Sequence, residues 1–356
     1  MQATLHDIEA LSLGQIETWN GLLAGLPTRS PFLSYAFCRA VHEARGGVRV
    51  LAIRGTNGEA GFLPFQIRRG RSLLRHGEQV GGSLSDQFGI IGNVSMSFDS
   101  QSLLNAANLS SLRFDRAIRE LIPDSFQDAE KVDCVLVEVE DFDRFVATLT
   151  TKHKDFVKAV ARSVRQLTRD SGPLSFELHA ADPSAALETL MSAKRGQYRR
   201  TGVKDGLSVS WRARTLFRLL REPETSLCRP LLSTLRCNGS WIASNFGLLC
   251  GDTVHICYPV FDPQYRRYGP GHILFFRIFE QGVLEGIRRF DFGPGEASYK
   301  LKYDGRVYSR WKGSLRRKSL GGYSERILQA CQWRLEKLAT GWRQTRAAKV
   351  DDANRV

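Results

Sequence analysis

Side chains that could carry out acid–base chemistry gather in one short segment, DFGPGEASYK at residues 291–300. A carboxylate can take a proton from an attacking group, a phenol can protonate a leaving group, and an ammonium can stabilise developing negative charge. We expect these roles: general base or acceptor-orienting group for Asp291 or Glu296, proton donor for Tyr299, and charge stabiliser for Lys300. The alternative is a turn-forming Asp291 and a solvated Lys300.

A second candidate site is a loop between an apolar run and a helical pattern. Residues 253–261 (TVHICYPVF) predict a buried strand, residues 273–284 a helix, and residues 289–292 the next strand. Pro270 suits a first helical turn, and the N–H groups at a helix start favour an anion. We expect a pyrophosphate-binding loop, with a plain surface loop as the alternative. The cofactor-binding candidates are Arg266, Arg267, Gly269, Gly271 and His272.

Other polar residues could contact an acceptor molecule. Lys194, Arg195 and Tyr198 fall on one predicted helix, and Asp86 lies in the first half of the chain. Solvated surface positions are an equally compatible interpretation of these residues. His255, within the apolar run, is a further candidate base, although a lone histidine on an apolar strand is more often a structural core residue.

Two hairpins predict how these sites are positioned. Asn57-Gly58 separates the apolar runs 48–53 and 60–67, and Asn238-Gly239 separates 230–235 and 241–249. Asn-Gly between apolar runs is typical of a tight β-hairpin. Helical patterns precede both hairpins, at residues 16–26 and 32–44, and at residues 185–198 and 211–220. This order suggests a duplicated α/β unit, with coincidence as the alternative.

Two amphipathic segments mark the remaining organisation. Residues 152–168 predict a helix and residues 176–179 a strand, so we place a domain boundary near residue 150. Residues 324–343 predict a basic helix that packs on the protein or contacts an anionic membrane or polysaccharide. The expected domains are residues 1–150, 151–320 and 321–356.

Composition excludes several classes of protein. The 356 residues carry a net charge of +14, which suggests an anionic partner. The seven cysteines include no C-x-x-C pair, and histidines are dispersed, so we expect neither a disulfide framework nor a metal site. The chain has no run of 18 apolar residues and no secretory signal pattern, which predicts a cytoplasmic protein.

Several motifs together resemble a known family. The segments are Pro31-Phe32-Leu33-Ser34, Ser85-Asp86, Lys194-Arg195-Gly196-Gln197-Tyr198, Phe261-Asp262-Pro263 and the 291–300 segment. They are similar to signatures of the CelD/BcsL-type proteins, GNAT-like acetyltransferases of cellulose and exopolysaccharide synthesis that are related to the FemAB transferases. The loop from Arg266 to Gly271 also resembles the R/Q-x-x-G-x-G/A loop that binds the acetyl-CoA pyrophosphate in GNAT acyltransferases.

The resemblance spans roughly residues 15–320. It implies an α/β (α+β) fold made of two tandem GNAT-like halves with mixed, mostly antiparallel sheets, and the predicted C-terminal helix follows them. It implies transfer of an acyl group from acetyl-CoA or another acyl-CoA to an amine or hydroxyl of a carbohydrate-linked acceptor. Two alternatives remain: a FemAB-like transferase that uses aminoacyl-tRNA, and a non-catalytic protein that binds an anionic envelope or nucleic-acid partner. No DNA-binding motif occurs, so specific DNA binding is not expected.

Overall fold

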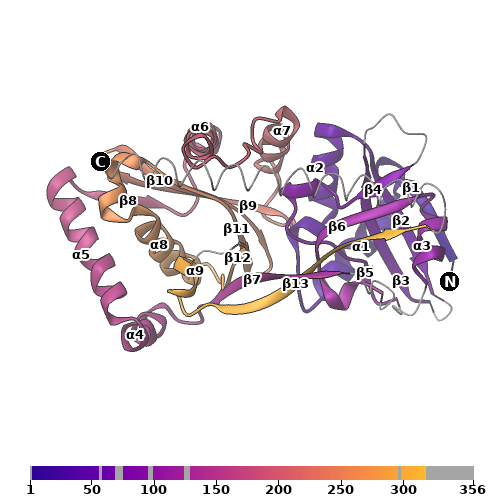
Figure 1. Ribbon diagram of the computed structural model, residues 1–356, viewed down its shortest axis with the longest axis horizontal. Coiled ribbons are helices and arrows are strands. Elements are labelled where there is room, and N and C mark those ends of the chain that lie inside the picture. The colour runs from indigo at the N-terminus through magenta and orange to yellow at the C-terminus, as the bar shows by residue number, and fades with distance from the viewer. Residues whose placement is uncertain are drawn as a thin grey trace, which may run out of the picture.

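One continuous sheet runs through the whole molecule in the computed structural model, which describes residues 2–55, 58–68, 75–94, 99–123, 129–295 and 298–317. The strand order is β1-β2-β3-β4-β6-β13-β7-β12-β11-β10-β9-β8, and β5 pairs with β3. Two neighbouring pairs, β4–β6 and β11–β12, are parallel and the others are antiparallel. Figure 1 shows the resulting elongated molecule, with its first half on the right and its second on the left.

The first half contains these elements in chain order: β1 (Gln2–Asp7), α1 (Leu13–Gly25), α2 (Tyr35–Arg45), β2 (Val48–Arg54), β3 (Ala60–Ile67), β4 (His76–Glu78), β5 (Ile91–Gly92), α3 (Ser100–Ala106), β6 (Ser111–Ala117) and β7 (Glu130–Glu138). Short 3-10 helices occur at η1 (Ile8–Ala10), η2 (Pro31–Leu33), η3 (Gly82–Leu84) and η4 (Arg119–Leu121).

The second half repeats this order after two connecting helices, α4 (Phe142–Lys152) and α5 (Lys154–Ser171). Its elements are β8 (Leu174–Glu177), α6 (Pro183–Thr201), α7 (Ser210–Leu219), β9 (Arg229–Cys237), β10 (Ser240–Cys250), β11 (Thr253–Phe261), η5 (Pro263–Tyr268), α8 (Pro270–Leu284), β12 (Arg289–Pro294), α9 (Ser298–Leu301) and β13 (Arg306–Arg316). The halves share the order strand, two helices, hairpin, strand, helix and two strands, with β5 added in the first half and the short α9 in the second, as the duplication predicts.

The last strands of the two halves are exchanged in the middle of the sheet. Strand β13, from the second half, pairs with β6 of the first half, and β7 pairs with β12 of the second half. In Figure 1 these two long strands run side by side between the lobes. The halves consequently share a hydrogen-bonded seam, and the boundary near residue 150, which falls inside α4, stays a prediction.

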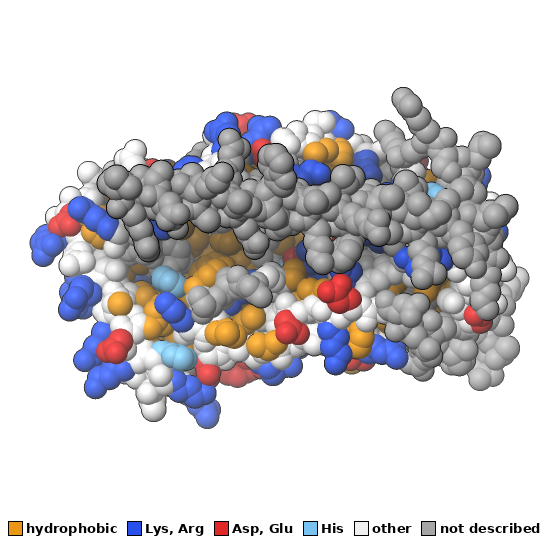
Figure 2. Space-filling view, viewed as in Figure 1, with side chains coloured by type: hydrophobic (Ala, Val, Ile, Leu, Met, Phe, Trp, Pro, Cys, Tyr) orange, Lys and Arg blue, Asp and Glu red, His pale blue; other side chains and the backbone are white. Residues whose placement is uncertain are grey.

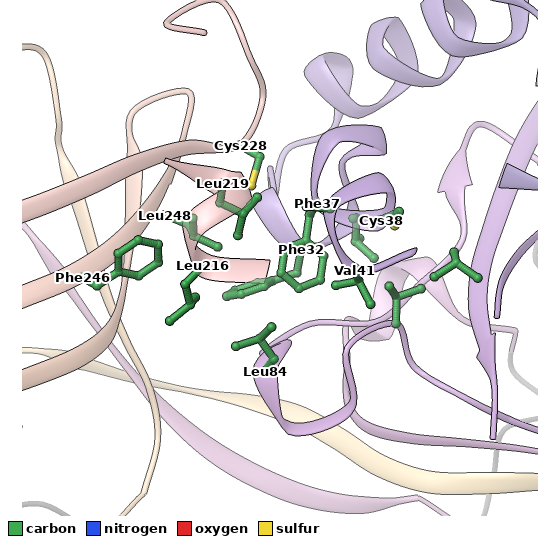
Figure 3. Close-up of a cluster of buried hydrophobic side chains, with 14 of the residues drawn as sticks. Phe32, Phe37, Cys38, Val41, Leu84, Leu216, Leu219, Cys228, Phe246 and Leu248 are labelled. Carbon is green, nitrogen blue, oxygen red and sulfur yellow. The ribbon is translucent and has the colours of Figure 1, made fainter. Parts of the chain in front are cut away.

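A hydrophobic core joins the halves across this seam. Phe32, Phe37 and Leu84 of the first half pack in the same buried cluster as Leu216 and Phe246 of the second (Figure 3). Burial of one such side chain contributes about 1.5–3 kcal/mol, so a cluster drawn from both halves holds them in a fixed relation. The groups at the seam are therefore positioned by packing as well as by the sheet.

A second core lies under α8 and decides which strand side chains face the seam. Phe275 and Phe279 of α8 pack edge-on against Phe292 and Phe290 of β12, with ring centroids 4.9 and 4.7 Å apart. Because side chains alternate along a strand, Asp291 points to the opposite face. The same alternation in β11 buries Val254 and Ile256 in this core and turns His255 the other way.

The sequence predicted most of these elements. Both hairpins are present, as β2–β3 and β9–β10, and Asn238 and Gly239 have the positive φ values, 46° and 77°, of their tight turn. The helix expected over residues 32–44 is divided, because Ser34 caps α2 by accepting a hydrogen bond from the Phe37 N–H. Residue Asn57 and the helix expected over 324–343 lie outside the described residues. No helix within the described ranges is long and apolar enough to cross a bilayer.

Candidate functional site

The sheet opens between the parallel strands β11 and β12. They pair at Thr253 with Arg289, Val254 with Phe290 and His255 with Asp291, and no further. β11 continues past a bulge to Phe261, while β12 turns at Gly293, whose φ is +59°. The two strands therefore diverge beyond His255 and Asp291, and the β11 backbone that faces this opening is left for a ligand.

An apolar cleft of about 300 Å³ adjoins the opening on the α8 side. Its walls come from β11, α8, α9 and α6: Pro259, Val260, Phe261, Gly269, Pro270, Gly271, His272, Leu274, Phe275, Tyr299 and Gln197. Figure 2 shows hydrophobic side chains at the surface in the region where α8 and α9 lie in Figure 1. A narrow cleft with apolar walls suits an extended, largely uncharged chain.

The start of α8 lies at this cleft, as the loop between Arg266 and His272 predicted. Gly269 adopts a left-handed conformation (φ 57°, ψ 50°) and Pro270 occupies the first helical turn. A Cβ added at Gly271 would find its nearest neighbour, Phe261, 3.9 Å away, so this glycine leaves space rather than avoiding a clash. The helix start can therefore present its N–H groups to an anion at the cleft.

The three charged or basic residues of the loop are placed differently. Arg266 and Arg267 are exposed on η5. The Arg267 guanidinium lies 3.6 Å from the Asp170 carboxylate and contacts the Tyr268 hydroxyl. His272 turns inward, where its Nδ1 lies 2.6 Å from the Tyr303 hydroxyl, and burial lowers its pKa. His272 is thus part of the cleft wall, and the two arginines are exposed on η5, which precedes α8.

Asp291 is the centre of a buried polar cluster. One carboxylate oxygen accepts the Gly293 N–H at 2.8 Å, and the other accepts the Tyr308 hydroxyl at 2.5 Å and lies 3.3 Å from His255 Nδ1. The residue is only 4% exposed. Three neighbours therefore fix both oxygens, and a carboxylate held in this way orients its partners.

His255 presents its second ring nitrogen without a partner. Its Nε2 is buried and makes no hydrogen bond within the described part of the chain. Burial lowers the pKa of His255. The negative charges of Asp291 and Asp86 oppose this shift, and the positive charge of Arg310 adds to it. The ring is consequently neutral near pH 7. With the proton on Nδ1 facing Asp291, Nε2 is left as a proton acceptor.

Asp86 joins this cluster from the first half, and its predicted contact with the acceptor stays a prediction. Its carboxylate pairs with Arg116 at 2.7 Å. A Cβ on Gly293 would stand 3.1 Å from Asp86 Oδ2, so the first half approaches the turn after β12 closely. Burial raises the pKa of Asp86, and the neighbouring Arg116 opposes that shift.

Lys300 is buried beneath the turn that follows β12. Its ammonium donates to the carbonyls of Phe292, Gly293, Pro294 and Gly295, at 3.0, 3.2, 2.9 and 3.4 Å. Because the ammonium N–H groups are engaged with backbone carbonyls, these contacts favour a positioning role for Lys300 over direct stabilisation of substrate charge. Glu296, the other candidate carboxylate, lies outside the described residues.

Tyr299 lines the apolar cleft. Burial raises the pKa of its hydroxyl, which therefore keeps its proton at neutral pH. The position of Tyr299 in the cleft wall is compatible with the predicted role of proton donor, which stays a prediction.

The three candidates on α6 do not share one surface. Lys194 is buried and donates to the Pro259 carbonyl at 2.7 Å, on the stretch of β11 that lines the cleft. Tyr198 is half-buried, with the Lys194 ammonium 5.4 Å from its ring centroid. Arg195 is exposed, and its Nε lies 3.4 Å from the Asp205 carboxylate. The structure therefore joins Lys194 to the β11 backbone at the cleft, packs Tyr198 against the core between the halves, and leaves Arg195 exposed.

Lys194 makes the stability of the protein depend on pH. Burial lowers its pKa from 10.5 to about 8. The unfolded chain thus binds more protons than the folded protein between these two values, and the free energy of unfolding rises with pH across this window. The shift corresponds to about 3 kcal/mol. We expect urea denaturation to show this rise in the wild type and not in Lys194→Met; parallel pH curves would contradict it.

Tyr308, Arg116 and Arg310 belong to the cluster, yet no motif singled them out. Tyr308 and Arg310 lie on β13 and Arg116 on β6, strands that the sequence did not predict. Their contribution depends on the exchanged strands, which bring residues from distant parts of the chain beside Asp291 and Asp86.

Comparisons with known proteins bear on the fold. Residues 154–301 match the family described as an acetyltransferase (GNAT) domain. No curated protein sequence matches the chain. Among solved structures, FemX is similar with a TM-score of 0.61 and 10% identity, over 88% of this chain and 97% of FemX.

Two further structures share the fold. A conserved protein of unknown function from Bacteroides thetaiotaomicron has a TM-score of 0.57 and 12% identity, over 88% of this chain and 100% of its own. The C-terminal domain of an Agrobacterium fabrum protein assigned as a lysylphosphatidylglycerol synthetase has a TM-score of 0.54 and 13% identity. The match covers 89% of this chain and 95% of that domain. The chain thus has a GNAT-like fold with a mostly antiparallel sheet, and its residues 154–301 match the acetyltransferase (GNAT) domain family.

Proposed function

We propose that the protein transfers an acyl group from acetyl-CoA or another acyl-CoA to an amine or hydroxyl of an acceptor. The observation that carries this proposal is the opening between β11 and β12, with the apolar cleft and the α8 start beside it, inside a domain that matches acetyltransferases. The cleft suits a pantetheine chain, and Gly269–Gly271 with Arg266 and Arg267 suits the pyrophosphate.

The reaction needs a base on the acceptor. His255 Nε2 takes the proton from the acceptor amine or hydroxyl while its nitrogen or oxygen attacks the thioester carbonyl carbon. Asp291 holds the imidazole through Nδ1 and stabilises the imidazolium that forms. In this proposal Asp291 orients the imidazole of His255, which differs from the base or acceptor-orienting role expected for it from the sequence, and His255 takes the proton.

The leaving group needs a proton. When the tetrahedral intermediate collapses, its C–S bond breaks and the CoA thiolate takes a proton from the hydroxyl of Tyr299, a residue that lines the cleft. The phenolate then regains a proton from His255 through solvent, which restores both groups. Lys300 contributes by holding the turn after β12 in place.

The acceptor remains a carbohydrate-linked amine or hydroxyl in this proposal, with a cytoplasmic reaction and with cellulose or exopolysaccharide synthesis as the pathway. The carbohydrate-linked acceptor and the pathway rest on the motif resemblance alone. The predicted basic helix at residues 324–343, with its membrane or polysaccharide contact, lies outside the described residues and is retained as a proposal.

Release of CoA thiol from acetyl-CoA, followed with a thiol reagent, tests the proposed reaction. We expect release to depend on an added amino sugar such as glucosamine and to survive treatment with RNase. Activity that appears only with aminoacyl-tRNA, and that RNase abolishes, would replace acyl-CoA by a FemAB-like donor. A folded protein inactive with either donor would support a non-catalytic binding role.

A further inference from the structure

A second cavity, of about 320 Å³, lies on the face of the sheet opposite α8. Thr253, His255, Arg289 and Asp291 line it, and these are the β11 and β12 residues that alternate with the side chains packed on α8. β7 and β13 and the first half complete the lining with Leu136, Arg306, Tyr308, Ser309, Arg310, Thr28, Arg29, Gln87 and Glu120. The proposed base therefore stands between this cavity and the strand opening.

The cavity is rich in arginine. Of its four arginines, Arg289 pairs with Asp252 at 2.6 Å and Arg306 lies 3.8 Å from Glu138. Within the described ranges, Arg29 and Arg310 make no ion pair. Arg310 is only 8% exposed, and its guanidinium stacks over the Tyr308 ring at 4.4 Å. A buried guanidinium without a carboxylate is costly unless an anion reaches it.

Several buried polar atoms at the cavity are also unpaired. Within the residues that the structure describes, no hydrogen-bond partner is found for Arg310 Nε, Arg289 Nε, Gln87 Oε1 or His255 Nε2. Buried polar groups in folded proteins are usually satisfied, so four exceptions lining one cavity mark a place where a ligand supplies the missing partners. Three are nitrogens and one is an amide oxygen, which together suit a ligand with acceptors and a donor.

We propose that this cavity binds the acyl acceptor, and that the acceptor carries an anionic group, a phosphate or a carboxylate, held by Arg29 and Arg310. This inference rests on the proposed acyl transfer, because it places the reacting amine or hydroxyl at His255 Nε2. The acyl-CoA chain then lies on the α8 side and the acceptor on the other, and the two meet through the opening between β11 and β12.

The volume sets the size of what the cavity holds. Since one water takes about 30 Å³ of liquid, 320 Å³ corresponds to roughly ten waters. That space suits one sugar ring with its charged substituent. A guanidinium–anion hydrogen bond contributes enough to change affinity by roughly 10- to 100-fold.

Three amino sugars distinguish the outcomes: glucosamine, glucosamine 6-phosphate and muramic acid, which carries a carboxylate. Each is titrated calorimetrically into the full-length protein, with and without CoA, and acetyl-CoA is titrated separately. We expect one or both anionic sugars to bind at least about 10-fold more tightly than glucosamine. The better of the two identifies a phosphate or a carboxylate as the recognised group.

Charge-removing variants assign the preference to this cavity. Arg29→Gln and Arg310→Gln are expected to reduce the preference for the anionic sugars by about 10-fold or more. The control Arg144→Gln, at an exposed position on α4, should leave this preference unchanged. If Arg310→Gln does not fold, binding of the three sugars by Arg29→Gln, a substitution at an exposed position, tests the inference. Equal binding of the three sugars, or a preference that survives in Arg29→Gln, overturns the inference. If the protein binds the anionic sugars but not acetyl-CoA, acyl-CoA is not the donor, whereas the assignment of the cavity as an anion-recognising site stands.

Discussion

His255→Gln is expected to lower kcat/KM for acyl transfer by about 10²–10⁴-fold, the usual contribution of a positioned general base. Glutamine fills similar space and can hydrogen-bond to Asp291, but it cannot accept the acceptor proton. Asp291→Asn should fall in the same range, because the amide no longer stabilises the imidazolium. Steady-state rates of CoA release, with acetyl-CoA saturating, measure both effects.

The pH profile separates this role from a structural one. The pKa of His255 lies below its ordinary value of 6.5, since burial and Arg310 outweigh Asp291 and Asp86. A neutral base is required, so kcat/KM should decline in acid with a midpoint below pH 6.5. The decline should disappear from the residual activity of His255→Gln. A folded His255→Gln protein with wild-type rates would contradict the assignment.

Gly271→Leu should abolish acyl-CoA binding while leaving the protein folded. A Cβ at this position meets only Phe261, at 3.9 Å, so the backbone tolerates a side chain. The added isobutyl group would occupy the apolar cleft of about 300 Å³, where the pantetheine is proposed to lie. We expect the Kd for acetyl-CoA, measured by calorimetry, to rise at least about 100-fold, equivalent to about 2.7 kcal/mol.

Gly21→Leu is the matched control for this variant. Gly21 lies on α1, and a Cβ there has nothing within 4 Å. The same substitution should leave acetyl-CoA binding unchanged at that distant site. Tight acetyl-CoA binding by Gly271→Leu would show that the ligand does not use the cleft.

Local patterns predicted the part of the site that is continuous in sequence. The apolar run 253–261 and the pattern at 273–284 correspond to β11 and α8, and Gly269 and Pro270 begin α8 as expected. These features depend on alternation, helical periodicity and the φ preferences of glycine and proline, all of which are local. The same reasoning found Asp291 and Tyr299.

The remainder depends on contacts between distant segments. Tyr308 reaches Asp291 because β13 crosses into the seam beside β7, which pairs with β12, and no local pattern encodes that exchange. Lys300 was expected to stabilise substrate charge, but only the folded turn shows its ammonium on four backbone carbonyls. His255 likewise gains its significance from Asp291, which lies on another strand.

A crystal structure of the protein soaked with CoA tests the central claim most directly. The account predicts the pantetheine chain between β11 and β12, with the pyrophosphate at the Gly269–Gly271 start of α8 and the sulfur near the His255–Asp291 pair. CoA bound elsewhere on the molecule, or an empty cleft at saturating CoA, would contradict the proposed acyltransferase site.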